Sequence, residues 1–189
     1  HFYLLLKLLF DDEWVAVIGF LLLVLHPRLY GHSFFNSKDI PFLSMMTVCF
    51  YYGALSFKRF NLKNTVLYGA TVGLLINIRI MGVVLVAGTL LLYLVEMLIS
   101  ERRAIKRALA QTFWFLLSTF IVLYATWPYL WDDPLNKVLN AFTTMSHYPF
   151  SNPVFYWGNM LKATELPWHY PVVWIGITTP LVFLFFSFW

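Results

Sequence analysis

The sequence predicts an all-α fold, a polytopic helical bundle integral to a membrane. Of its 189 residues, 60% are hydrophobic and 12% are charged. In soluble proteins about 45–50% of the residues are apolar and about 25% are charged. The apolar residues gather in runs, and the longer runs match the ~20 residues that a helix needs to cross about 30 Å of hydrocarbon. These runs lack the two-residue alternation of a membrane barrel strand, so we expect helices.

Six membrane spans are expected within one domain that covers residues 1–189. They are residues 14–26, 40–57, 65–78, 82–100, 108–126 and 172–189. A single helix over 65–99 would be about 52 Å long at a rise of about 1.5 Å per residue, so the chain must turn near Asn77, Arg79 and Gly82. Residues 1–10 resemble the end of a preceding helix, and we expect the chain to be an internal piece of a larger protein.

Basic residues are concentrated in two short connections. Lys58, Arg59 and Lys63 occupy the first, and Arg102, Arg103, Lys106 and Arg107 occupy the second. The positive-inside rule places both connections in the cytoplasm. Alternating spans then place the loops 27–39 and 127–171 on the outer face. This topology explains the net charge of +4, and nucleic-acid binding is not expected.

The outer segment 127–171 contains an amphipathic pattern over "PLNKVLNAFTTMS", where apolar residues recur at helical spacing. Asp133 is suited to cap this helix, and Pro134 to its first turn. The helix would lie in the membrane interface beside a lipid-access site, or pack on the bundle as a lid. The stretches "HYPFSNPVFYWG" and "ELPWHYP" that follow it are expected to be ordered loop.

Ionisable residues gather in "HPRLYGHSFFNSKDIPF", residues 26–42. Asp39 is either a helix cap or surface partner of Lys38, or a general base supported by His32, Asn36 and Lys38. An Arg near hydrocarbon tends to face a cavity or an anion. Arg79 is therefore either an anchor at the outer interface or a phosphate ligand.

Four further residues are candidates for binding, namely Asp132, Asp133, Trp168 and His169. Asp132 and Asp133 could bind a divalent cation through carboxylate oxygens, although helix capping accounts for Asp133 without a metal. His169, next to Trp168, is either a ligand for a sugar or phosphate or a structural loop histidine. The sequence contains no phosphate-binding glycine loop, zinc-ligand spacing or nucleophile elbow. No metal or cofactor is therefore expected.

Four stretches taken together resemble a known family: "HPRLYGHSFFNSKDIPF", "YGATVGLLINIRIMGVV", "TWPYLWDDP" and "LPWHYPVVWIGITTPL". In their order and spacing they are similar to the bacterial dolichyl-phosphate-mannose protein mannosyltransferase-like family of GT-C glycosyltransferases. The resemblance covers essentially the whole chain.

The resemblance implies a function. A GT-C enzyme transfers a sugar from a polyprenyl-phosphate donor, here on the outer face of the bacterial inner membrane, to a protein, lipid or glycan acceptor. Asp39 matches the second of the family's two usual carboxylates. The first would precede His1, so this piece is expected to be inactive alone. A transporter or flippase of an anionic or lipid-linked substrate is the alternative, because broken helices with an intramembrane Arg also occur there.

Overall fold

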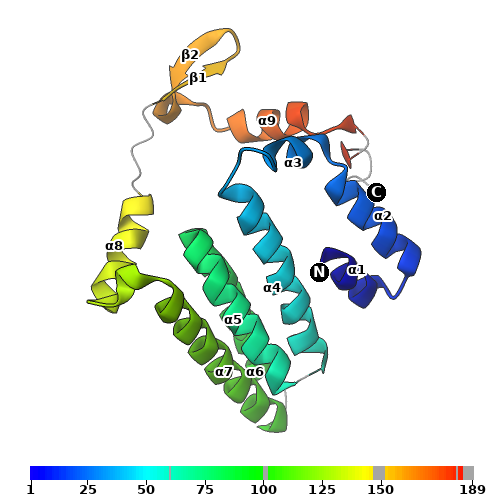
Figure 1. Cartoon of the computed structure of the whole chain (residues 1–189), viewed down its shortest axis with the longest axis vertical. Coiled ribbons are helices and arrows are strands. Elements are labelled where there is room, and N and C mark those ends of the chain that lie inside the picture. The colour runs from blue at the N-terminus through cyan, green and yellow to red at the C-terminus, as the bar shows by residue number, and fades with distance from the viewer. Residues whose placement is uncertain (60, 100–101, 147–151, 182, 185–189) are drawn as a thin grey trace. The chain divides into compact units, whose positions relative to one another are not determined.

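The computed structural model describes residues 1–59, 61–99, 102–146, 152–181 and 183–184. This part of the chain is mostly helical, as predicted (Figure 1). The chain divides into two compact units, His1–Thr143 and Thr144–Trp189. The assignment of residues 1–189 to one domain stays a prediction.

The first unit consists of helices joined by short connections. In chain order they are α1 (Phe2–Phe10), α2 (Glu13–Val24), α3 (Pro27–His32), α4 (Asp39–Arg59), α5 (Leu62–Ile78), the 3-10 turn η1 (Ile80–Gly82), α6 (Val83–Ile99), α7 (Arg102–Thr126) and the 3-10 turn η2 (Pro128–Leu130). Helix α8 (Pro134–Ser146) follows and continues across the division between the units. The sequence predicted helices at α1, α2 and α4–α8.

Within the described residues, three helical stretches are long and apolar enough to span a membrane: Asp39–Lys58, Ile80–Ile99 and Ile105–Thr126. Large apolar side chains point outward from them, and Ile99 is 81% exposed. Extensive exposed apolar surface would be unfavourable in water. Helices α2 and α5, with 12 and 17 residues, are shorter than these stretches, and their role as spans stays a prediction.

Helices α5 and α7 pack closely because two glycines of α5 face the α7 backbone. A Cβ atom added to Gly69 would lie 2.4 Å from the carbonyl oxygen of Phe115, and one added to Gly73 would lie 2.7 Å from that of Thr119. Glycines four residues apart in an apolar helix allow another helix to approach in this way. The side chain of Thr119 donates a hydrogen bond to the carbonyl oxygen of Gly69 at 3.0 Å, which is possible only at such close approach.

Hydroxyl pairs connect the helices inside the bundle. The hydroxyls of Tyr68 on α5 and Thr89 on α6 lie 2.7 Å apart, and those of Ser56 on α4 and Thr65 on α5 lie 2.8 Å apart. All four residues are buried. These bonds satisfy polar groups that lipid could not solvate.

The predicted turn between residues 78 and 82 is confirmed. Helix α5 ends at Ile78, Arg79 is extended (φ −148°, ψ 131°), and η1 leads directly into α6. The side chain of Asn77 donates to the carbonyl oxygen of Thr126 at 3.0 Å. The turn is thereby tied to the end of α7.

The predicted outer loops contain more regular structure than expected. The short helix α3 lies within 27–39, and its Pro27 occupies a first-turn position that suits proline. Within 127–171, residues Pro153–Tyr156 (β1) and Asn159–Lys162 (β2) pair as an antiparallel hairpin. This hairpin corrects the prediction of loop at "NPVFYWG" and adds two short strands to a chain that is otherwise mostly helical. Residues 147–151 lie outside the described part.

A two-residue turn of Trp157 and Gly158, both with positive φ (49° and 81°), closes the hairpin. The 3-10 turn η3 (Ala163–Glu165) and helix α9 (Tyr170–Thr178) complete the described part of the second unit. Thr179 is extended and precedes Pro180, which disfavours helical backbone at the preceding residue. The predicted span 172–189 is therefore not one unbroken helix. Residues 182 and 185–189 lie outside the described part.

Candidate functional site

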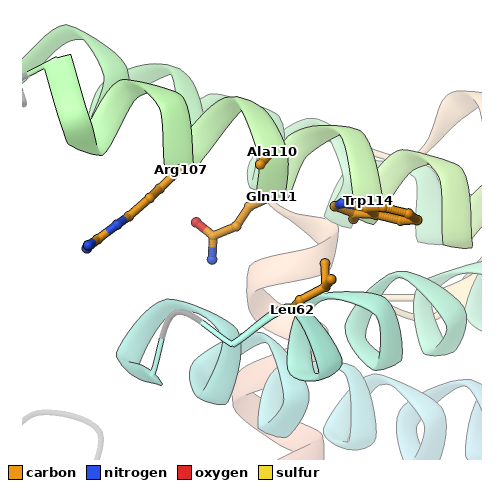
Figure 2. Close-up of a pocket in the computed structure, with 5 residues that line it drawn as sticks. All are labelled: Leu62, Arg107, Ala110, Gln111 and Trp114. Atoms are coloured by element: carbon orange, nitrogen blue, oxygen red, sulfur yellow. The ribbon is translucent and has the colours of Figure 1, made fainter.

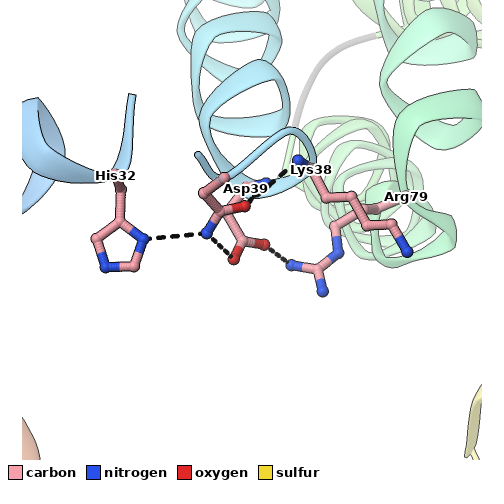
Figure 3. Close-up of polar contacts among 5 residues, drawn as sticks. His32, Lys38, Asp39 and Arg79 are labelled. Atoms are coloured by element: carbon pink, nitrogen blue, oxygen red, sulfur yellow. Dashed lines mark hydrogen bonds and ion pairs between the residues drawn. The ribbon is translucent and has the colours of Figure 1, made fainter. Parts of the chain in front are cut away.

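Asn36 organises a cluster of polar side chains where α4 begins. Its carbonyl oxygen accepts hydrogen bonds from the backbone N–H groups of Asp39 (2.9 Å) and Lys38 (3.3 Å), a local turn that starts the helix. Its amide nitrogen donates to Asp39 Oδ2 at 2.8 Å and lies 3.1 Å from His32 Nδ1 (Figure 3). Asn36 therefore connects His32 to the Asp39 carboxylate.

Arg79 joins this cluster from a distant part of the sequence. Its Nη1 atom forms an ion pair with Asp39 Oδ1 (Figure 3). The pair forms because α4 begins where α5 ends, so the extended Arg79 lies beside the first turn of α4. The side chains of Asp39 and Arg79 are 52% and 45% exposed. A ligand can therefore reach both groups.

This arrangement orients the Asp39 carboxylate through both of its oxygens. The amide of Asn36 contacts one oxygen and the guanidinium of Arg79 contacts the other. A guanidinium carries five N–H donors in a planar fork, so Arg79 has donors that a phosphate can accept from. Chemically, the site can position an acidic group beside a bound anion.

Lys38 does not pair with Asp39, contrary to one of the two alternatives drawn from the sequence. In the described part of the chain, the ion-pair partner of Asp39 is Arg79. The Lys38 side chain extends away from the carboxylate in Figure 3. Lys38 adds positive charge near the site without neutralising Asp39.

Trp168 and His169 belong to an aromatic cluster in the second unit. Trp168 is 87% exposed, and its ring centroid lies 5.6 Å from that of His169. The His169 ring also lies 6.1 Å from Tyr156, which packs against Tyr170 at 5.1 Å. Tyr156 was not predicted, because its place in the cluster depends on the β1–β2 hairpin.

Asp132 and Asp133 have local partners. Lys137 Nζ contacts Asp132 Oδ2 at 2.8 Å and lowers the pKa of that carboxyl through the hydrogen bond and its positive charge. Asp133 accepts a 2.7 Å hydrogen bond from the Asn136 side chain and a 3.3 Å bond from its backbone N–H, as a helix cap does. Among the described residues, no group of three His, Cys, Asp or Glu side chains could hold a metal ion.

Two cavities lie at the other end of α4 and α5 from the cluster around Asp39. One, of about 460 Å³, is lined by Leu62 of α5 and by Arg107, Ala110, Gln111 and Trp114 of α7 (Figure 2). Another, of about 820 Å³, lies among α1, α4 and α5. Neither includes Asp39 or Arg79, whose cluster is an open surface site.

No protein-family model, curated protein or solved structure matches the chain. The likeness to GT-C glycosyltransferases therefore rests on the sequence stretches quoted above, and the activity that it implies is a proposal.

Proposed function

We propose that the protein is a membrane glycosyltransferase that uses a polyprenyl-phosphate sugar as donor on the non-cytoplasmic face. The observation that carries the proposal is the Asp39–Arg79 pair. It stands at the start of two stretches able to span a membrane, Asp39–Lys58 and Ile80–Ile99. The phosphate of a lipid-linked donor occupies this depth because its isoprenoid chain stays in the hydrocarbon.

The orientation follows from charge. Lys58, Lys63, Lys106 and Arg107 lie at the helix ends opposite to Asp39 and Arg79, and basic ends face the cytoplasm. The Asp39 end then faces the periplasm or exterior, as expected from a GT-C bundle in a bacterial inner membrane. The exposed apolar side chains of α8, among them Leu135, Leu139 and Phe142, suit a helix that lies in the membrane interface there.

In the proposed reaction, an oxygen of the acceptor attacks the anomeric carbon of the sugar. The bond from that carbon to the donor phosphate breaks, and polyprenyl phosphate leaves with the bonding electrons. Asp39 takes the proton of the attacking hydroxyl, and Arg79, with Lys38, stabilises the charge on the departing phosphate. His32 and Asn36 orient Asp39, and the assignment of Trp168 and His169 as sugar ligands rests on the sequence alone. Inversion of the anomeric centre follows from a single displacement.

Donor binding would change the partners of Arg79. The donor phosphate competes with Asp39 for the guanidinium, and movement of Arg79 toward the phosphate would leave the carboxylate able to accept a proton. The ion pair thus suits a resting site that opens when the donor arrives. A lipid-linked sugar, a membrane lipid environment and an acceptor are the only partners that this chemistry requires.

The test compares two variants with a matched control in membranes that contain the protein at its natural length. Asp39→Asn removes the base and should lower sugar transfer about 10²–10⁴-fold. Arg79→Ala should lower it about 10²-fold. Asp12→Asn makes the same chemical change at the cap of α2, where Asn serves equally well, and should leave transfer unchanged. Transfer is measured with a radiolabelled polyprenyl-phosphate sugar.

Unchanged transfer in both Asp39→Asn and Arg79→Ala would remove these residues from the mechanism. Movement of a lipid-linked substrate across the membrane without formation of a glycosidic bond would instead support the transporter or flippase. The break of α5 and α6 at Arg79 is the feature that such a carrier would use.

A further inference from the structure

A groove of about 820 Å³ lies among α1, α4 and α5, at the end of the bundle away from Asp39. Its polar lining includes Lys7, Lys58 and Lys63, one from each helix, and its apolar lining includes Leu4, Leu55 and Leu67. Lys58 ends the stretch Asp39–Lys58 that can span a membrane. The lysines therefore lie at the depth of lipid headgroups. The leucines of the lining extend from there toward the hydrocarbon.

The groove carries surplus positive charge. Lys7 contacts Glu13 Oε1 at 3.1 Å, and Lys58 donates to the carbonyl oxygen of Leu8 at 2.6 Å. That carbonyl is neutral, and an ammonium group has three N–H donors, so Lys58 can still bind an anion. Neither Lys58 nor Lys63 forms an ion pair with a carboxylate of the described residues. Asp11 is the one acidic residue of the lining.

Lys58 and Lys63, which form no ion pair among the described residues, lie beside apolar side chains. This combination fits an amphiphile better than a small anion. A phosphate can lie between Lys58 and Lys63, while an acyl chain covers Leu4, Leu55 and Leu67. Basic pockets between membrane helices bind anionic headgroups in this way. Filling the groove would also remove exposed apolar surface from contact with water.

We propose that this groove binds an anionic phospholipid of the cytoplasmic leaflet, with the phosphate on Lys58 and Lys63. The site lies at the opposite end of α4 from Asp39 and uses none of the residues assigned to sugar transfer. Its occupancy can be tested whether or not the protein is a glycosyltransferase.

The experiment measures lipid binding to the purified protein by native mass spectrometry, with phosphatidylglycerol and phosphatidylcholine as probes. We expect phosphatidylglycerol to bind more tightly than phosphatidylcholine. Each lysine near a lipid surface contributes about 1 kcal/mol, so the double variant Lys58→Gln/Lys63→Gln should bind phosphatidylglycerol roughly 30-fold more weakly. Lys106→Gln, an exposed lysine at the same end but outside the lining, should bind it as tightly as the unaltered protein.

A second variant separates loss of charge from loss of folding, and a competitor separates lipid binding from binding of a free anion. Lys58→Arg/Lys63→Arg retains both charges and should retain the preference for phosphatidylglycerol. Equal binding of the two lipids, or equal losses in Lys106→Gln and the double glutamine variant, would overturn the proposal. Displacement of the lipid by millimolar inorganic phosphate would also overturn it, because the site would then select a free anion.

Discussion

Single hydroxyl groups make contacts between helices that lipid cannot replace. The Tyr68 hydroxyl lies 2.7 Å from Thr89 Oγ1, and Thr89 also donates to the carbonyl oxygen of Leu85 at 2.7 Å. Removing the tyrosine hydroxyl would therefore break the contact between α5 and α6 without leaving Thr89 unsatisfied. The free energy of unfolding should therefore fall by the contribution of one interhelical hydrogen bond.

We expect Tyr68→Phe to lower the free energy of unfolding by about 0.6–1 kcal/mol. The control is Tyr30→Phe, at an exposed position of α3, where loss of the hydroxyl should have no measurable effect. Unfolding of both variants can be followed by circular dichroism in detergent with increasing denaturant. A decrease of more than about 3 kcal/mol in the free energy of unfolding of Tyr68→Phe would show that the hydroxyl makes stabilising contacts besides the one with Thr89.

Asp39 and Arg79 were both chosen from the sequence, but their pairing was not. The sequence offered Lys38 as the partner of Asp39 because the two are adjacent. Asp39 and Arg79 are 40 residues apart in the sequence. Their contact depends on the relative axial position of α4 and α5, which no local sequence pattern indicates. The turn at Arg79 was predictable because one helix over 65–99 would exceed the bilayer thickness.

At the scale of elements, the contact of α5 with α7 depends on the absence of side chains at two positions. Gly69 and Gly73 leave room for the α7 backbone, and an added Cβ at Gly73 would meet the Thr119 carbonyl oxygen at 2.7 Å. A backbone oxygen cannot rotate away as a side chain can. The two helices would have to separate to admit a methyl group.

Gly73→Ala should therefore destabilise the protein by about 1–3 kcal/mol, the usual cost of overpacking. Gly88→Ala, in α6, adds the same methyl group where nothing lies within 4 Å. It should leave stability unchanged or raise it by up to about 1 kcal/mol, because Ala favours helix over Gly. Thermal unfolding in detergent compares them. Equal melting temperatures would contradict the close packing of α5 on α7.

The β1–β2 hairpin shows why some elements escaped prediction. Its strands have four residues each, too few for a periodic pattern, and lie in a stretch dominated by proline and aromatic residues. Its signal was local: Gly158 after Trp157, a position that adopts φ 81°. Tryptophan is an unusual first residue for such a turn, and proline nearby favoured a loop.

At the scale of the molecule, charge is distributed unevenly between the two ends of the bundle. Lys58, Lys63, Lys106 and Arg107 lie at one end, and the cluster of Asp39 and Arg79 lies at the other. The sequence predicted that the loops 27–39 and 78–82 share a side, and the Asp39–Arg79 contact confirms this. Which side of the membrane it is stays a prediction.

Cysteine labelling tests the orientation. The chain has one cysteine, Cys49, which is buried, so Cys49→Ser provides a clean background. Lys38→Cys and Lys106→Cys each place a thiol at an exposed position, one at each end. A membrane-impermeant maleimide should label Lys38→Cys in intact cells and Lys106→Cys only after permeabilisation. The reverse pattern would invert the topology, and labelling of both in intact cells would exclude a spanning bundle.

The uneven charge has an electrical consequence. In an energised cell the cytoplasm is negative, and carrying one elementary charge across 100 mV costs about 2.3 kcal/mol. If the bundle end with Lys58, Lys63, Lys106 and Arg107 faces the cytoplasm, as predicted, these four basic side chains on α4, α5 and α7 would oppose any rotation that carried them outward. With that orientation, the resting voltage would act as a continuous restoring force on the bundle, long after insertion is complete, and it would weaken if the cell were depolarised.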